Sequence, residues 1–171
     1  MYKRIGIILI ILFIIVISGC TYENKTPSRE KKYIGNGVSF NYPPEYEVKE
    51  VKNKSGVFLV GQSGWDPNYT FQISKELVDN NGKSKGKTIE DLKNPKLYTG
   101  FNVEEIENIK INNVTGFEII YARYNLPYVK YEKIIFEKSN KRYTLLFRYN
   151  GVGVTDTRAT LAISNSFQVL N

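Results

Sequence analysis

The 171-residue sequence contains no histidine and only one cysteine, one methionine and one tryptophan. Without histidine there is no imidazole to act as a general base, to complete a Ser-His-Asp triad or to bind a metal ion. A single cysteine cannot form a disulfide within the chain. These absences exclude several classes of enzyme and metalloprotein. We therefore expect no catalytic residues, no metal site and no cofactor.

The one cysteine, Cys20, ends an apolar run. Lys3 and Arg4 precede an uncharged hydrophobic stretch, Ile5–Ile17, which closes on Ser18-Gly19-Cys20. A short basic start, a hydrophobic stretch and small residues before a cleavage point are typical of a secretory signal. The segment resembles the signal of bacterial and archaeal lipoproteins. The resemblance implies cleavage before Cys20, a diacylglyceryl group on its sulfur, and a place on the extracytoplasmic side of the cell membrane.

Two other interpretations of this segment stay open. A transmembrane helix needs about 18 or more apolar residues, and the run from Ile5 to Gly19 has 15. A signal for full secretion also ends in small residues but does not need a cysteine. Lipidation would give stable anchoring, because two acyl chains hold a protein on a bilayer where one chain is marginal.

The chain is basic, with 24 lysines and arginines against 17 acidic residues and a net charge of +7. Loss of Lys3 and Arg4 with the signal lowers this charge to +5. Outside the cell, such an excess favours anionic surfaces: lipid headgroups, wall polymers or the acidic face of an envelope protein. Nucleic acid is not expected as a partner there. The charge also serves simply to keep the domain soluble.

The sequence divides into three parts by composition. Residues 1–19 form the predicted signal peptide and residues 20–32 a polar, proline-containing stretch that we interpret as a flexible tether. Residues 33–171 are expected to fold as one α+β domain with its own core.

Most of this domain shows the pattern of β-strands. Residues 37–42 alternate apolar and polar side chains, as a half-buried strand does. Shorter strands are expected around Tyr46–Val48, Val57–Val60 and Tyr69–Ile73. Four successive candidates in the second half predict an antiparallel meander: Ile106–Ile111, Phe117–Arg123, Val129–Phe136 and Tyr143–Tyr149.

Two helices are expected beside the strands. Thr88 is placed to cap a short helix ending near Asn94, with Asp91 three residues on as in a capping box. A second helix is predicted from Asp156 to Asn165 with Thr155 as its cap. Strands with two separate helices predict the α+β class with a central antiparallel sheet.

Four segments resemble the PsbP-like family. They are the opening Gly37-Val-Ser-Phe-Asn-Tyr-Pro43, the turn Ile109–Gly116, the strand Arg142–Phe147 and the closing Ser164–Phe167. The resemblance covers residues 33–171 and implies a central antiparallel sheet flanked by helices, an α/β/α sandwich. The family's namesake is a non-enzymatic extrinsic subunit of photosystem II. Its histidine-dependent metal contacts have no counterpart in this sequence, so no functional residue is carried over.

Two near-motifs fail on spacing. Gly82–Thr88 has three residues between its glycines, where a phosphate-binding loop needs four. Asp79–Gly82 begins like a calcium loop but lacks the ligands expected further along. We interpret both as turns of a solvated loop.

Two groups of residues are candidates for contact with a partner. Trp65 and Asp66 lie in a glycine- and proline-containing loop, where an exposed indole would provide rigid contact area. The ordinary alternative, which we expect, folds the indole back over a sheet edge. The second group surrounds the turn 125–127 and mixes aromatic with basic side chains. Because successive residues of a strand point to opposite faces of a sheet, about half of these side chains would lie on each face. The group comprises Tyr121, Arg123, Tyr124, Tyr128, Lys130 and Tyr131.

These features favour a lipid-anchored extracytoplasmic binding or assembly module without catalytic activity. One alternative is an envelope glycan hydrolase acting through two carboxylates, for which Asp66, Glu104, Glu105 and Glu118 are candidates that no spacing places together. Another is a small solute-binding receptor, although a chain of this length is short for two lobes.

Overall fold

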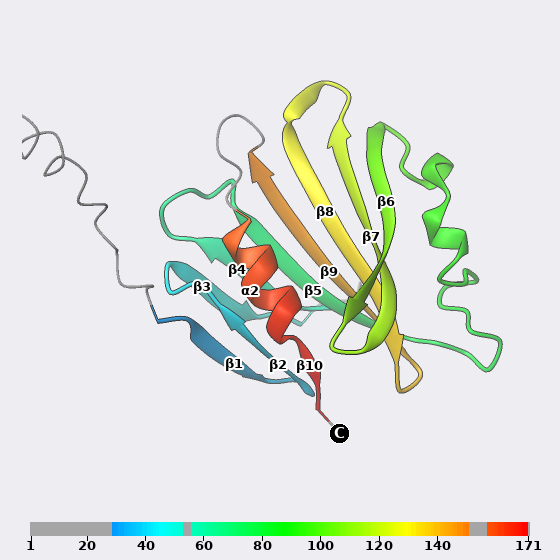
Figure 1. Ribbon diagram of the computed structural model, residues 1–171, viewed down its shortest axis with the longest axis horizontal. Coiled ribbons are helices and arrows are strands. Elements are labelled where there is room, and N and C mark those ends of the chain that lie inside the picture. Colours follow the sequence, from blue (N-terminus) through cyan, green and yellow to red (C-terminus); the bar gives the residue numbers. More distant parts are fainter. Residues whose placement is uncertain (1–28, 53–55, 151–156, 171) are drawn as a thin grey trace, which may run out of the picture.

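The computed structural model describes residues 29–52, 56–150 and 157–170, so Cys20 and the segment before it lie outside the described residues. Strands dominate this part of the chain (Figure 1). They are β1 (Lys31–Gly35), β2 (Val38–Tyr42), β3 (Tyr46–Glu50), β4 (Val57–Ser63), β5 (Thr70–Leu77), β6 (Phe101–Ile111), β7 (Val114–Arg123), β8 (Leu126–Lys138), β9 (Lys141–Asn150) and β10 (Gln168–Val169). β1 begins two residues inside the stretch interpreted as tether.

The strands form two antiparallel sheets. The larger has seven strands in the order β3-β4-β5-β9-β8-β7-β6, and the smaller has three in the order β1-β2-β10. The predicted meander is confirmed, since β6 to β9 pair in sequence order. Because β9 then pairs with β5, the segment between β5 and β6 must cross the sheet to reach its far edge.

Tight turns fix the register of the meander. Asn112 and Asn113 join β6 to β7 with φ values of 45° and 66°, and Ser139 and Asn140 join β8 to β9 with 52° and 55°. Positive φ at both central residues gives a turn whose twist matches that of the strands. Both turns lie in the gaps between the predicted strands.

One face of the seven-stranded sheet, called here the helix face, packs against the three-stranded sheet and α2 (Arg158–Ser166). Phe40 of β2 is fully buried at the centre of this layer. Its ring centroid lies 6.1 Å from that of Phe71 on β5 and 5.9 Å from that of Phe167, which follows α2. Burying each such side chain contributes about 1.5–3 kcal/mol, so these rings hold the two sheets together.

The opposite, outer face of the sheet carries a second apolar cluster. Phe117 and Ile119 of β7 and Ile135 of β8 are buried beneath Leu92 and Tyr98. The last two belong to the segment that crosses from β5 to β6. The crossing segment therefore covers the outer face, where the sequence predicted a helix.

That predicted helix is wrong. Residues 88–94 form only a short 3-10 helix, η1 (Asp91–Lys93), followed by a second one, η2 (Pro95–Leu97). The capping bonds are present, because Thr88 and Asp91 bond each other reciprocally. Proline disfavours the α conformation in the residue before it, and Asn94 is extended with φ −71° and ψ 114°. Pro95 thus stops the helix after one turn.

The second predicted helix is confirmed as α2. Ala159 and Ile163 are buried, as the predicted apolar stripe requires. Thr157 occupies the N-cap position without a side-chain capping bond, and the expected cap Thr155 lies outside the described residues. α2 has nine residues, and no helix in the described ranges is long and apolar enough to cross a bilayer. The expected sandwich is therefore partly right: a helix and a small sheet cover one face, and a loop covers the other.

Gly116 of β7 tests the close packing of the meander. A Cβ atom on Gly116 would overlap the carbonyl oxygen of Ile135 and lie 2.8 Å from the Cβ of Phe136. We expect Gly116→Ala to lower the free energy of unfolding by about 1–3 kcal/mol, because the neighbouring strand must shift. Chemical denaturation measures the change. Gly64→Ala is the control, since its Cβ would meet only the Glu45 carbonyl oxygen, at 3.4 Å; equal losses in both variants would contradict the expectation.

Candidate interaction surface

The two predicted contact groups lie at the same end of the seven-stranded sheet. Strand register places them there: Thr70 pairs with Arg148, and Val129 with Asn150. The β4–β5 loop (64–69), the β7–β8 turn (124–125) and the first residues of β6 therefore share one end, called here the loop edge (Figure 1). Between the loop and the turn lie three strand spacings, or roughly 15 Å.

Trp65 stands out from this end. Its side chain is 88% exposed, so the expected arrangement, with the indole folded back over a sheet edge, is wrong. The loop is held by its own polar groups. The Asp66 carboxylate accepts from the backbone N–H of Asn68 at 2.8 Å, and the N–H of Gly64 donates to the Glu45 carbonyl at 2.9 Å. These bonds fix the backbone so that the indole points into solvent.

The aromatic and basic group around the β7–β8 turn is divided by strand alternation, as expected. Tyr121 belongs to the buried outer-face cluster, and Tyr131 packs against it. Tyr124 and Tyr128 are 66% and 44% exposed. Arg123 is exposed as well, and its guanidinium lies 5.8 Å from the Phe101 ring centroid. Only part of the predicted group is thus available to a partner.

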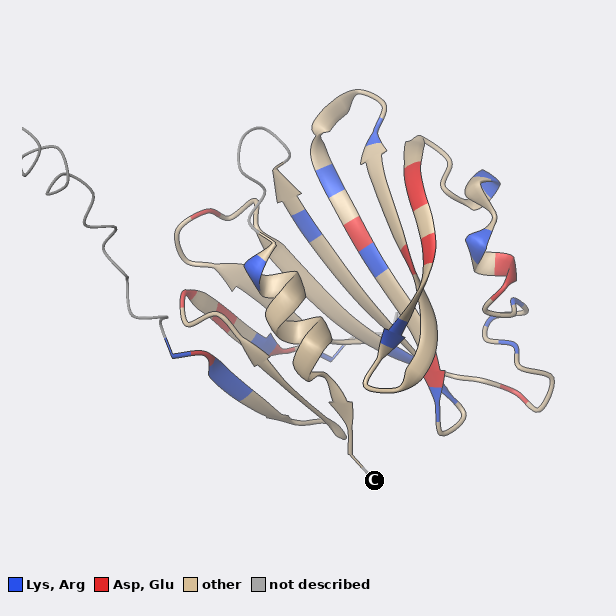
Figure 2. Cartoon of the chain, viewed as in Figure 1, with Lys and Arg blue, Asp and Glu red and all other residues tan. Residues whose placement is uncertain are grey.

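Lys130 lies on the helix face and is already paired. Its ammonium is 2.7 Å from the carboxylate of Glu104 on β6. Ala122 of β7 stands opposite Lys130 in the register, and its small side chain leaves room for the pair to bridge over β7. Figure 2 shows the acidic and basic bands on β6 and β8. Lys130 contributes less free charge to the loop edge than the sequence suggested.

A carboxyl pair lies further along the same face. It joins the half-buried Glu118, named above as a candidate, to the buried Glu132, which the sequence pattern did not single out. Glu132 of β8 is 6% exposed and is hydrogen-bonded to Glu118 of β7 and to Thr160 of α2. Burial, followed by the hydrogen bond and charge of Glu118, raises the pKa of Glu132 to about 9. A neutral Glu132 can donate its proton to Glu118 while accepting from the Thr160 hydroxyl. The sequence does contain a signal for this site. Glu132 lies two and four residues before Ile134 and Phe136, so strand alternation places it on the same buried sheet face.

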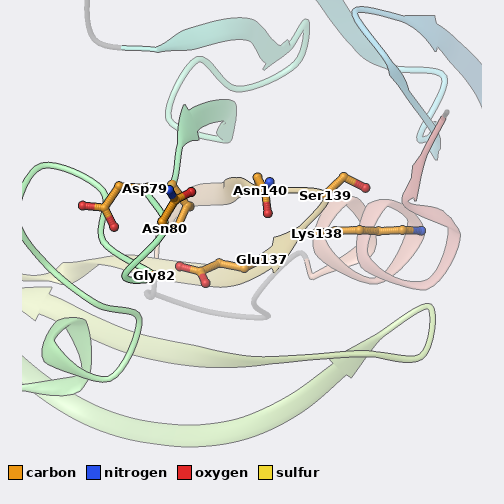
Figure 3. Close-up of a pocket in the computed structure, with 8 residues that line it drawn as sticks. Asp79, Asn80, Gly82, Glu137, Lys138, Ser139 and Asn140 are labelled. Atoms are coloured by element: carbon orange, nitrogen blue, oxygen red, sulfur yellow. The ribbon is translucent and has the colours of Figure 1, made fainter.

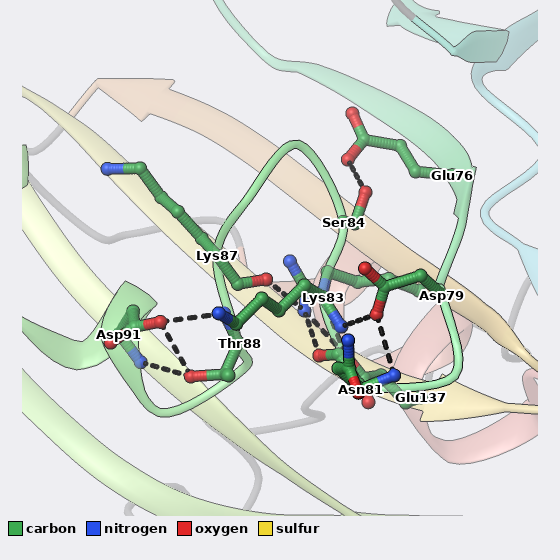
Figure 4. Close-up of polar contacts among 11 residues, drawn as sticks. Glu76, Asp79, Asn81, Lys83, Ser84, Lys87, Thr88, Asp91 and Glu137 are labelled. Atoms are coloured by element: carbon green, nitrogen blue, oxygen red, sulfur yellow. Dashed lines mark hydrogen bonds and ion pairs between the residues drawn. The ribbon is translucent and has the colours of Figure 1, made fainter.

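The two near-motifs are turns, as predicted (Figure 4). The Asp79 carboxylate accepts from the backbone N–H groups of Asn81 and Lys83 at 2.9 and 2.8 Å. Arg142 of β9 fixes the loop from beneath by donating to the carbonyl oxygens of Gly82 and Lys87. One Asp79 oxygen and the carbonyl oxygens of Gly82 and Lys87 are therefore already engaged within the domain.

A pocket of about 480 Å³ opens at the other end of the sheet, beside the β8–β9 turn (Figure 3). Its acidic side chains have partners: Asp79 holds its own turn, and Glu137 is 2.7 Å from Arg142. Within the described ranges, no three acidic or cysteine side chains come together to hold a metal ion. The pocket is lined by Val78, Asp79, Asn80, Gly82, Glu137, Lys138, Ser139 and Asn140.

The exposure of Trp65 is directly measurable, because it is the one tryptophan of the chain. We expect iodide to quench its fluorescence almost as readily as that of free tryptophan amide, since 88% of the side chain is exposed. Stern–Volmer titration of the free protein checks this. Strong protection from iodide would remove Trp65 from the candidate surface.

Because Glu132 of this carboxyl pair is buried, the free energy of unfolding should depend on pH. The pKa of Glu132 rises from 4.5 to about 9 on folding, so the folded state keeps a proton that the unfolded chain loses. The favourable contribution is complete below about pH 4.5, and it is lost as the pH rises toward 9, by up to about 1.4 kcal/mol per unit. In Glu132→Gln the amide can make both hydrogen bonds but does not titrate. The free energy of unfolding of this variant, relative to that of the native chain, should therefore increase between pH 4.5 and pH 9.

Urea denaturation at several pH values measures this difference. Glu107→Gln is the matched control, because Glu107 is an exposed glutamate directly opposite Glu118. Parallel stability curves for the native chain and Glu132→Gln would contradict the neutral state of Glu132.

The chain matches no protein-family model, and a comparison with curated proteins found no match. It is similar in structure to the cyanobacterial PsbP protein (CyanoP) of Synechocystis, with a TM-score of 0.61 at 14% identity, over 90% of this chain and 99% of that one. It is also similar to a protein of Bacteroides thetaiotaomicron, with a TM-score of 0.54 at 16% identity, over 82% of this chain and 48% of that one. This chain thus spans about half the length of the second protein.

Identities of this size show a shared fold and nothing further, because one fold hosts many functions. The described part of the chain has a PsbP-like fold built mainly from antiparallel sheet, as the sequence resemblance predicted.

Proposed function

We propose that the protein is a lipid-anchored extracytoplasmic binding or assembly module without catalytic activity, and that the loop edge is its contact surface. The anchor is the diacylglyceryl group expected on Cys20, in keeping with the basic, apolar and small residues that precede it. The PsbP-like fold of the following residues is compatible with such a role.

The exposed aromatic residues of the loop edge carry this proposal. Trp65, Tyr124 and Tyr128 are 88%, 66% and 44% exposed at one end of the sheet. Tyrosine, tryptophan and arginine dominate the energetics of protein contact surfaces, because they give large contact areas at little entropic cost. Arg123 stands beside them, and the described residues offer it no carboxylate partner. Strand ends and a hydrogen-bonded loop hold these side chains in place.

The geometry weakens the hydrolase alternative. A glycosidase needs two carboxyl groups about 5–5.5 Å or 6.5–9.5 Å apart, with room for substrate between them. Glu118 and Glu132 are instead hydrogen-bonded to each other. Asp66 holds its own loop, and Glu104 is paired with Lys130.

The arrangement of the described residues weakens the receptor alternative. Such receptors clamp a ligand between two lobes. In the described residues, the two apolar clusters instead lie on opposite faces of a single sheet. Two open pockets of about 480 and 510 Å³ are found among the described residues, and neither is lined by Trp65, Tyr124 or Tyr128.

The anchor and the surface can be tested separately. Intact-mass measurement of the native protein should show a chain beginning at Cys20 with its lipid, whereas a chain beginning at Met1 or a free thiol would contradict the anchor. The surface is tested with residues 20–171 carrying Cys20→Ser, sedimented with envelope fragments of the host. We expect Trp65→Ala to weaken binding about tenfold or more.

Leu77→Ala is the matched control for Trp65→Ala. Leu77 is 77% exposed, but it lies at the far end of β5, opposite Lys141. Equal binding by the two variants would show that the loop edge is not the contact surface.

A further inference from the structure

We propose that the loop edge lies on the headgroup layer of the anionic bilayer that holds Cys20, with Trp65, Tyr124 and Arg123 making the contact. The inference rests on the lipid anchor proposed above and names the partner of the same surface. It follows from where the chain enters the fold, from the length of chain before that point, and from the side chains at the loop edge.

The chain enters the fold beside the loop that carries Trp65. β1 begins at Lys31, which pairs with Tyr42 at the end of β2. A tight turn follows, and Tyr46 at the start of β3 pairs with Ser63, two residues before Trp65. In Figure 1, the start of β1, the β2–β3 turn and the β4–β5 loop lie along the same side of the molecule.

The chain between the anchor and the fold is short. Ten residues separate Cys20 from Lys31; if they are the tether that the composition predicts, their root-mean-square reach is roughly 18 Å. The far end of the sheet is more remote than this, because the eight residues of β5 alone extend roughly 26 Å. An anchor on Cys20 therefore keeps the loop edge nearer to the bilayer than the opposite end.

The side chains of the loop edge suit a bilayer surface. Tryptophan and tyrosine are enriched where proteins meet the headgroup layer, because their rings are amphipathic. Trp65 and Tyr124 are spread along the sheet end over roughly 15 Å, and they line neither of the two pockets described for this part of the chain. A spread of separate rings fits an extended surface better than a small ligand, which needs a concave site.

The charges at this end favour anionic lipids. Two carboxylates near it are paired with basic groups: Glu104 with Lys130 and Glu45 with Arg158. Asp66, Glu30 and the exposed Glu105 keep their negative charge. Arg123 and the exposed Arg29, Lys31 and Lys32 have no carboxylate partner among the described residues, so four basic groups stand against three acidic ones and the balance is slightly positive. Each basic residue near an anionic membrane contributes about 1 kcal/mol of attraction.

The sole tryptophan provides a probe at the site itself. Residues 20–171 with Cys20→Ser are titrated with vesicles of equal parts phosphatidylglycerol and phosphatidylcholine, and with vesicles of phosphatidylcholine alone. We expect the first vesicles to shift the emission of Trp65 to shorter wavelength and to protect it from iodide. The effect should weaken at high salt, which screens the attraction.

Two charge variants separate a specific contact from general attraction. Arg123→Gln should weaken vesicle binding roughly fivefold, the equivalent of about 1 kcal/mol. Lys110→Gln removes the same charge from an exposed site at the far end of β6, and it should change binding little. Trp65 remains as the probe in both variants. Equal losses in the two variants, or unchanged emission with anionic vesicles, would overturn the inference.

Failure of this inference is distinguishable from failure of the proposed function. Binding to envelope fragments that depends on Trp65, without any binding to lipid vesicles, would assign the loop edge to an envelope protein or polymer. That outcome overturns the bilayer contact and leaves the binding module. An unmodified Cys20 in the native protein would remove the basis of both.

Discussion

The packing of Phe40 against Phe71 and Phe167 joins the two sheets, and the position of every exposed group depends on it. Gly61 of β4 makes this contact possible, because a Cβ atom there would overlap the Phe71 ring. With β2 fixed against the larger sheet, the turn into β3 is brought beside the β4–β5 loop. The start of the folded chain and Trp65 are consequently neighbours. The same aromatic layer that stabilises the fold thus also places the loop edge beside the start of the folded chain, from which the proposed anchor would extend.

The polar groups on the helix face show how the fold tolerates acidic residues near its core. A buried carboxylate without a partner would cost several kcal/mol. Glu132 avoids this cost by keeping its proton and bonding Glu118 and Thr160, which links β7, β8 and α2. Glu104 is exposed and carries no such cost, and it is paired with Lys130 across β7. These pairings also explain why the conspicuous charges of the sequence contribute little to a contact surface, whereas Arg123 remains available.

The strands were predictable because the chain alternates apolar and polar side chains where one sheet face is buried. The four strands of the meander needed only this local pattern. The turn expected at 125–127 lies instead at 124–125, since Leu126 and Pro127 already belong to β8. The helix at residues 88–94 was predicted wrongly because Pro95, which follows it, outweighs the capping box. The orientation of Trp65 was predicted wrongly for another reason: hydrogen bonds from Gly64 to Glu45 and within the Asp66 turn, which no local pattern shows, hold the loop open.

The sequence by itself determined the strand pattern, the absence of histidine chemistry and the expected lipid attachment at Cys20, because each of these depends on residues adjacent in the chain. Only the tertiary structure decided which separate segments meet. Strand register brought Glu118 to Glu132, and sheet order brought the loop of Trp65 to the same end as the turn beside Arg123. Such meetings depend on pairings between residues far apart in sequence, and neither composition nor periodicity encodes them.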